Sequence, residues 1–278
     1  MHIYDVSGND LTEDLRLLTD KDVGMYSVVV ENGRYNGSSY YLCRIPKTTL
    51  DGKRIKPKVA ITTLDGAVSG TKYSALDFAK RNNTMFCCNA GLFNTQTMIP
   101  QGQTIINGVS MTNTPMTDDM GSPIADDECY PLCIDASGNL SAPYERSVDT
   151  ADMINDGVKY AVTAWGQFIE NYAKADVSKF NEIVHTGAYA RQCIGQYQNG
   201  DYFVLSCDGI KGSITANESG MTYNTLAELL ISKGVKFAYS LDGGGSTETV
   251  LGNRHVNPIF EGTSGRRVPT VIYFDIEV

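Results

Sequence analysis

The sequence contains no apolar run long enough to cross a membrane. Of its 278 residues 42% are hydrophobic, but no stretch of about 18 apolar residues occurs, so we expect no transmembrane helix and no membrane partner. The first ten residues have neither a basic stretch nor an apolar core, so we expect no signal peptide. These absences favour a cytoplasmic protein, or a phage-encoded one found in the host cytoplasm or the virion.

Positive charge is also scarce. Lys and Arg number 23 against 32 Asp and Glu, which gives a formal net charge of -9. Nucleic-acid-binding proteins usually carry a basic patch or stripe, and the sequence shows no such cluster. We therefore expect no nucleic-acid polymer among its partners.

Histidine and paired cysteine motifs are too few to predict a zinc site. The three histidines are far apart, and Cys129 and Cys133 have no second pair to complete a ligand set. Most of the seven cysteines occupy apolar surroundings, where a reduced cysteine behaves as a small hydrophobe. We expect no metal ligand and no cofactor, with a divalent cation held by carboxylates as the alternative.

Short apolar stretches separated by turn signals dominate the chain. Strands are predicted over 23–31, 39–45, 58–64, 84–89, 190–196, 202–207 and 268–276, a hairpin over 103–109 with a type I′ turn at Asn107–Gly108, and helices over 73–81, 176–183 and 222–233. We predict an α+β fold, a mixed β-sheet core with flanking helices in a single catalytic domain over residues 51–278. Residues 1–50 would add N-terminal strands as an appended piece.

The segment Leu-Asp-Gly-Gly-Gly-Ser-Thr-Glu, residues 241–248, is the most informative motif. An apolar run leads directly into Asp242, although an ionised carboxylate is costly to bury. Three glycines cost backbone entropy and bring no side chain to pack, so stability offers no reason for them. A hairpin turn is the plain alternative. A nucleotide phosphate loop does not fit, because no Gly-Lys-Ser/Thr follows. The motif favours a site that a polar ligand approaches closely.

Other strand ends share this combination of polar residues and glycine. Asn89 and Asn94 flank a small-residue turn, and Arg191 stands alone inside an apolar strand. Asp208 ends another strand and precedes a glycine. The helix predicted over 222–233 carries Glu228 and leads towards the glycine motif.

In this order the segments resemble the phosphodiester glycosidase family. That family shows an Asn-Gly-Gly-Phe-Phe-like turn, an Ile-x-Asn-Gly hairpin, an Arg-Thr-Ala-Ile-Gly-like strand, a Val-Asp-Gly strand end and a helix running into Asp-Gly-Gly-Gly-Ser-Thr. The matches here are 89–94, 106–108, 191–195, 207–209, 225–228, 240–247 and the closing pair Arg267–Val268. The resemblance implies a hydrolase that cleaves between a sugar anomeric carbon and a phosphodiester, releasing sugar and a phosphomonoester.

The resemblance also suggests a role for each residue. Hydrolysis at an anomeric carbon commonly uses two carboxylates, which would be Asp208 and Asp242. Arg191 would hold the phosphate, since a planar guanidinium suits phosphate oxygens. The residues expected to bind substrate are Asn89, Asn94, Gly243, Gly244, Gly245, Ser246 and Thr247. Glu228 and Arg267 would support the site, and a purely structural role is the alternative for both.

Two other functions fit the same residues. One is a non-catalytic carbohydrate-binding module of a phage tail or surface assembly, and the other is a metal-dependent phosphodiesterase. Retention of both Asp208 and Asp242 favours the glycosidase. The expected partner is a small-molecule or glycan sugar phosphodiester, and the oligomeric state stays open.

Overall fold

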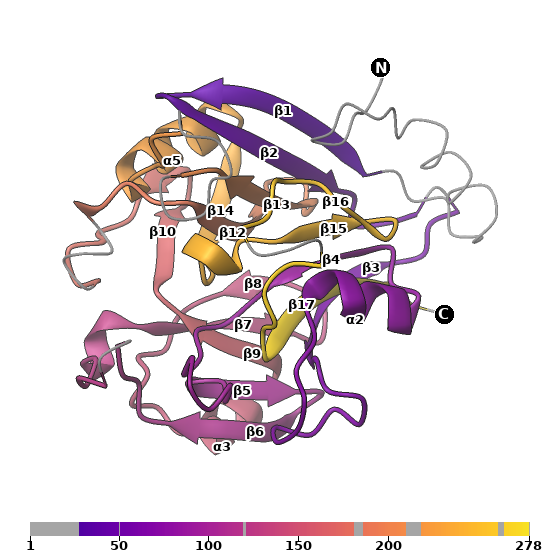
Figure 1. Ribbon diagram of the computed structural model, residues 1–278, viewed down its shortest axis with the longest axis vertical. Helices are drawn as coiled ribbons and strands as arrows, with labels where there is room; N and C mark the ends of the chain where they lie inside the picture. The colour runs from indigo at the N-terminus through magenta and orange to yellow at the C-terminus, as the bar shows by residue number, and fades with distance from the viewer. Residues whose placement is uncertain are drawn as a thin grey trace.

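The computed structural model describes residues 28–49, 51–118, 121–180, 186–209, 218–260 and 264–277. This part of the chain is mostly β-structure, arranged in three sheets with a few short helices (Figure 1). None of its helices is long and apolar enough to span a membrane. All seven cysteines are buried and none forms a disulfide.

The largest sheet has seven strands. Their order is β1 (Val29–Tyr35), β2 (Ser38–Ile45), β13 (Tyr202–Cys207), β12 (Arg191–Tyr197), β14 (Val235–Ser240), β10 (Gly166–Glu170) and β11 (Ala173–Lys174). Because β2 pairs with β13, strands from the first 50 residues extend this sheet.

Two five-stranded sheets complete the β-structure. The β4 sheet has the order β16 (Arg254–His255), β15 (Thr249–Leu251), β4 (Phe86–Asn89), β17 (Thr270–Ile276) and β3 (Ile55–Ile61). The β5 sheet has the order β6 (Val109–Thr114), β5 (Gly102–Ile106), β9 (Val158–Ala164), β7 (Tyr130–Asp135) and β8 (Leu140–Ser141). One buried cluster unites the three sheets, with Phe86, Leu132 and Tyr239 each contributed by a different sheet.

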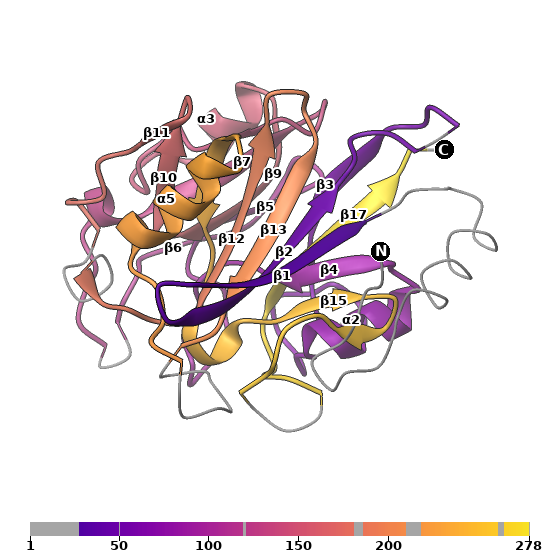
Figure 2. The same ribbon diagram turned by 90° about the horizontal axis from the view of Figure 1, so that it is seen from above.

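The helices cover the outer faces of the sheets. They are α2 (Ala75–Asn82), α3 (Thr150–Asn155) and α5 (Tyr223–Ser232), with 3₁₀ turns η1 (Asp126–Glu128) and η2 (Gly244–Ser246). α5 packs against the seven-stranded sheet (Figure 2). Its N-cap Thr222 accepts a hydrogen bond from Thr225 N–H, and Leu226 and Leu230 are buried. Gly234 follows it with φ +79°, so the helix predicted over 222–233 is confirmed within a residue at each end.

The predicted mixed sheet is wrong for the described strands, which all pair antiparallel. β13 and β14 are joined through α5, a connection that suggests parallel neighbours. However, β12 lies between them and pairs antiparallel with both. The strands from β7 to β11 were not predicted. Residues 176–180 of the helix predicted over 176–183 form no helix, and 181–183 lie outside the described residues.

The antiparallel order brings several predicted site residues to one edge. Since β12 runs against β13 and β14, its first residue, Arg191, lies beside the last residue of β13, Cys207. In the same way Cys193 lies opposite Ser240, at the end of β14. Asp208 and Asp242 follow these two strand ends in the sequence.

Candidate active site

Asn89, at the end of β4, holds the loop of residues 242–248, here called the glycine loop, at both of its ends. Its Nδ2 donates to Asp242 O at 2.6 Å, and its Oδ1 accepts from Glu248 N–H at 3.0 Å. The side chain is fully buried. The amide that the sequence predicted as a sugar ligand therefore positions the glycine loop in this structure.

The three glycines of the loop have a steric cause. A Cβ on Gly243 would lie 2.7 Å from the carbonyl oxygen of Ala190, and one on Gly245 would lie 2.6 Å from Arg266 Nη2. Gly244 has φ +58° and donates its N–H to Ala190 O at 2.9 Å. The view that stability gives no reason for these glycines is therefore incomplete, because the backbone of Ala190 leaves no space for a side chain at Gly243 and the positive φ favours glycine at Gly244.

Asp208 and Thr247 line one small pocket, together with Ala190, Cys207, Asn257 and Pro258. Each of the two is only 6% exposed. Thr247 Oγ1 is buried and has no hydrogen-bond partner in the described structure. A buried hydroxyl without a partner costs about 1–3 kcal/mol, and the pocket as it stands has no space for a water molecule.

Asn257, which lines this pocket, belongs to a buried polar network that sequence reasoning missed. Asn257 Nδ2 donates to Thr247 O at 3.0 Å, and its Oδ1 accepts from Thr249 N–H at 2.8 Å. Thr249 Oγ1 in turn lies 2.8 Å from both Gln192 Nε2 and Ser206 Oγ. Because these side chains come from β12, β13 and the segment that follows the loop, the network locks the glycine loop to the seven-stranded sheet.

Arg191 is buried and has bonds to the backbone. Its Nε donates to Met221 O at 3.0 Å and its Nη2 to Gly187 O at 2.7 Å. The guanidinium carbon also lies 4.2 Å from the centroid of the Tyr223 ring. The side chain therefore ties two chain segments together beside Asp208, and a role in phosphate binding would come in addition to these contacts.

Glu248 anchors the far end of the glycine loop and was not singled out from the sequence. Its carboxylate accepts from Ala75 N–H at 3.1 Å and from Leu76 N–H at 3.0 Å, at the beginning of α2. His255 Nε2 lies 2.8 Å from Glu248 Oε1. A carboxylate at a helix N-terminus is stabilised by the unpaired N–H groups and the helix dipole. Some 173 residues separate Glu248 from Ala75, so no local signal reveals the contact.

A second pocket, the basic pocket, lies beside the glycine loop. It measures about 810 Å³ and is lined by three cations, Lys72, Arg266 and Arg267, and by the turn that Asn94 begins. Asn94 Oδ1 accepts from the N–H groups of Gln96 and Thr97, which shapes this turn. Arg266 Nη1 lies 3.5 Å from Ser246 Oγ, so it is Arg266 that contacts the loop, while the predicted Arg267 is exposed at the pocket.

Glu228 lies apart from these residues. It is exposed on α5 and pairs with Lys174 of β11 at 2.7 Å. The structure thus gathers Asn89, Arg191, Asp208 and the glycine loop, and leaves this glutamate outside.

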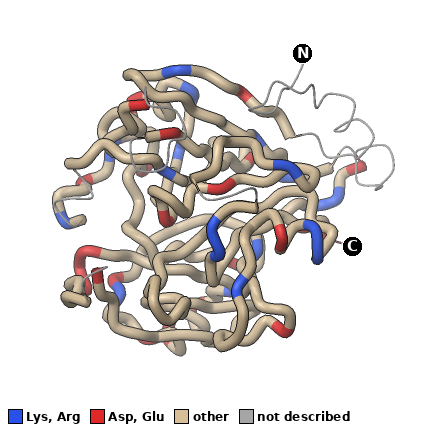
Figure 3. The backbone as a smooth tube through the Cα atoms, viewed as in Figure 1, with Lys and Arg blue, Asp and Glu red and all other residues tan. Residues whose placement is uncertain are grey.

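In the described ranges, no group of three or more His, Cys, Asp or Glu side chains is arranged to hold a metal ion. Lys and Arg are interspersed with Asp and Glu along the described backbone (Figure 3).

The family profile for phosphodiester glycosidases matches residues 82–275. This span covers more than half of the chain and includes both aspartates and the glycine loop. The chain therefore belongs to the phosphodiester glycosidase family.

Among its relatives is the SPbeta prophage-derived uncharacterized protein YomE of Bacillus subtilis (strain 168). The two are 24% identical over 245 residues, which are 84% of this chain and 36% of the relative. The chain thus spans about a third of that relative's length.

Two solved structures share the fold. One is the catalytic domain of zebrafish N-acetylglucosamine-1-phosphodiester alpha-N-acetylglucosaminidase, auto-inhibited by its pro-peptide. It matches with a TM-score of 0.64 and 17% identity over 89% of this chain and 82% of the other. The second is a hypothetical protein from Synechocystis, with a TM-score of 0.64 and 12% identity over 91% of this chain and 62% of the other.

Proposed function

We propose that the protein hydrolyses the bond between the anomeric carbon of a sugar and a phosphodiester oxygen. Membership of the phosphodiester glycosidase family supports this class of reaction. The observation that carries the proposal is the buried hydroxyl of Thr247 in the glycine loop, which has no hydrogen-bond partner among the described residues and lines a small pocket with Asp208. A sugar hydroxyl or a phosphate oxygen would satisfy it once substrate opens this pocket.

Asp208 and Asp242 would supply the two carboxylates. Water adds its oxygen to the anomeric carbon, the bond from that carbon to the bridging oxygen breaks, and the phosphate leaves as a monoester. One carboxylate accepts the proton of the water or attacks the carbon first, and the other stabilises the oxocarbenium-like transition state. A phosphate monoester is already a good leaving group, so strong acid assistance to it is unnecessary.

Cations on both sides of the glycine loop would neutralise the phosphate. Arg191 lies beside Asp208, and Arg266 lies 3.5 Å from Ser246 Oγ. The proposal therefore adds Arg266 to the phosphate-binding role predicted for Arg191. Guanidinium groups suit this role because they present several N–H donors in one plane.

The test is incubation with nucleotide sugars and other sugar-1-phosphodiesters in ¹⁸O-labelled water, followed by mass spectrometry of the products. We expect free sugar that carries the label, and an unlabelled phosphomonoester. Label in the phosphate would mean that the phosphorus–oxygen bond breaks, which contradicts the proposal. Together with loss of activity in a chelator, that result would establish a metal-dependent phosphodiesterase.

A second candidate is a non-catalytic carbohydrate-binding module of a phage particle. The prophage-derived relative favours a phage-encoded protein. Saturable binding of a sugar phosphodiester with no turnover in the same assay would establish this module and overturn the hydrolase.

A further inference from the structure

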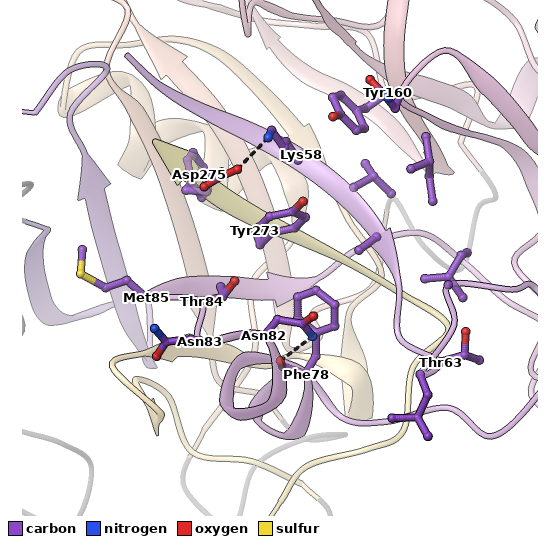
Figure 4. Close-up of a pocket in the computed structure, with 18 of the residues that line it drawn as sticks. Lys58, Thr63, Phe78, Asn82, Asn83, Thr84, Met85, Tyr160, Tyr273 and Asp275 are labelled. Carbon is purple, nitrogen blue, oxygen red and sulfur yellow. Dashed lines mark hydrogen bonds and ion pairs between the residues drawn. The ribbon is translucent and has the colours of Figure 1, made fainter. Parts of the chain in front are cut away.

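A third pocket, here called the β4 groove, lies against β3 and β17 of the β4 sheet. It measures about 860 Å³, within the range typical of small-molecule sites (Figure 4). Met85, just before β4, lines it, whereas Asn89, at the end of β4, holds the glycine loop. At about 3.3 Å per residue of strand, Met85 and Asn89 are roughly 13 Å apart. No residue that lines the β4 groove belongs to the glycine loop or lines the pocket of Asp208 and Thr247, so the groove is separate from the candidate active site.

Aromatic side chains form one wall of the β4 groove. Phe78 and Tyr273 are in contact, with ring centroids 5.7 Å apart and planes inclined by 54°. Tyr273 lies between Phe78 and the Lys58–Asp275 pair, and Tyr160 stands across from it (Figure 4). Both tyrosines are partly exposed. Aromatic rings of this kind offer an apolar face and a polar tip, which match the C–H face and the hydroxyls of a sugar ring.

Three asparagines from three separate turns stand at the rim. Asn83 ends α2, Asn107 lies in the β5–β6 turn and Asn253 lies in the β15–β16 turn, with φ values of 51°, 51° and 65°. All three are exposed and line the groove, and within the described structure none of their side chains forms a hydrogen bond. Each carboxamide offers both donors and an acceptor, which suits pairs of adjacent sugar hydroxyls.

The lining of the groove carries no net charge. Lys58 and Asp275 are the charged residues among those that line it, and they pair with each other at 2.7 Å. A phosphate or a nucleotide would find no unpaired cation among these lining residues. Burial is the largest effect on the Tyr273 hydroxyl and raises its pKa, so the hydroxyl stays protonated at neutral pH and can donate. The groove suits a neutral ligand rich in hydroxyls.

We propose that the β4 groove is a second carbohydrate-binding site, which holds about two or three rings of a neutral glycan. The rings lie against Tyr160 and Tyr273, and the asparagines at the rim bond the hydroxyls. No bond is cleaved there. The site goes beyond the proposed hydrolysis, because it would retain a glycan chain near the glycine loop whatever reaction the loop performs.

The test uses the full chain carrying Asp242→Asn. This protein is titrated with three neutral trisaccharides, maltotriose, cellotriose and the trimer of N-acetylglucosamine, and binding is measured by NMR. We expect at least one to bind saturably. Adding Tyr160→Ala or Asn253→Gly should weaken that binding by about tenfold, the equivalent of one or two hydrogen bonds. Tyr172→Ala, which removes an exposed tyrosine of the β10–β11 turn, is the matched control and should leave binding unchanged.

Asn253→Gly should fold normally, because glycine readily adopts the left-handed backbone conformation at this position. Weaker binding by this variant therefore reports the loss of the side chain. Absence of saturable binding for all three trisaccharides overturns the proposal. Binding that is insensitive to both groove variants overturns it as well, as does preferential binding of the neutral nucleosides adenosine or uridine. If sugar phosphodiesters are not hydrolysed but trisaccharide binding depends on Asn253, the hydrolase proposal fails and the groove proposal stands.

Discussion

The side-chain amide of Asn89 bonds the carbonyl oxygen of Asp242 at 2.6 Å, and so joins the β4 sheet to the end of the seven-stranded sheet. The side-chain oxygen of Asn89 accepts a hydrogen bond from Glu248 N–H. Asn89→Asp retains the shape of the side chain but removes the donor, so Asp242 O loses its partner. We expect a loss of about 1–3 kcal/mol in the free energy of unfolding, measured by urea denaturation, and a large loss of activity.

The matched control for this change is Asn155→Asp, which makes the same substitution at an exposed position in α3. It should alter stability by less than about 0.5 kcal/mol. Equal stability of the Asn89 variant and the wild type would contradict the role of the amide in holding the glycine loop.

Removal of either proposed catalytic carboxylate should stop turnover while the fold survives. We expect Asp242→Asn and Asp208→Asn each to lower kcat by at least about 100-fold, since each takes away a group that acts on the reacting atoms. Asp152→Asn, on the exposed surface of α3, is the control and should retain full activity. Undiminished turnover of the Asp242 variant, with an unchanged circular dichroism spectrum, would refute the assignment.

Thr247 and Thr249 provide a paired test of the buried hydroxyl. Thr247 Oγ1 has no partner in the described structure, whereas Thr249 Oγ1 bonds Gln192 and Ser206. Thr247→Val should therefore raise the free energy of unfolding by about 1 kcal/mol, and Thr249→Val should lower it by about 1–3 kcal/mol.

Thr247→Val should lower the activity although it raises the stability. If its hydroxyl bonds the substrate, Thr247→Val loses about tenfold in kcat/KM, or 1.4 kcal/mol. A variant that is more stable and equally active would show that the hydroxyl does not meet the substrate.

Glu218 is linked to Asp208 through Ser39. Its Oε2 accepts from Ser39 N–H at 2.6 Å and its Oε1 from Arg34 at 2.7 Å, while Ser39 O accepts from Asp208 N–H at 2.9 Å. Burial raises the pKa of Glu218, but the bonds from Ser39 and Arg34 outweigh it, so the pKa falls below its ordinary value of 4.5. The ionised form therefore stabilises the folded state.

This stabilisation is complete above the pKa of the unfolded chain and is lost as the pH falls through the lower folded pKa. We expect Glu218→Gln to be less stable than the wild type by about 1–3 kcal/mol at pH 7. The gap should close below about pH 4.5, as measured by urea denaturation at pH 7, 5, 4 and 3. A gap that stays constant over this range would mean that the charge of Glu218 contributes nothing.

Local features of the fold could be predicted from the sequence, because short-range chemistry determines them. The helix around Leu226 needs only its cap and its apolar face. The turn at Asn107–Gly108 has φ values of 51° and 75°, the type I′ geometry that these two residues favour. Asp208 and Asp242 were also predicted from local patterns, since each follows an apolar strand.

The contacts that shape the site could not be predicted, because they join distant segments. Glu248 meets the beginning of α2 across 173 residues. The bonds of Asn257 to the glycine loop depend on how the hairpin β15–β16 returns, which no short pattern encodes. The choice between Arg266 and Arg267 needs the direction of each side chain, and only the structure shows that Arg266 reaches Ser246.

Arg266 should bind the phosphate of the substrate, because it is the cation of the basic pocket that reaches the glycine loop. Arg266→Met retains much of the length and loses the charge. We expect KM for a sugar phosphodiester to rise about tenfold or more, with a smaller change in kcat, since one charge-assisted contact is worth about 1.5–3 kcal/mol. The rise of KM with salt concentration should also become shallower than in the wild type.

Arg44→Met is the control for Arg266→Met. Arg44 is an exposed arginine of β2 in the seven-stranded sheet, and it pairs with Asp201. It should leave both KM and its salt dependence unchanged. If Arg266→Met behaves like this control, the phosphate is held elsewhere, and Arg191 is the remaining guanidinium beside Asp208 to test. Arg191→Lys would then be compared with the wild type by the same KM measurement, with the free energy of unfolding measured alongside, because Arg191 also bonds Met221 and Gly187.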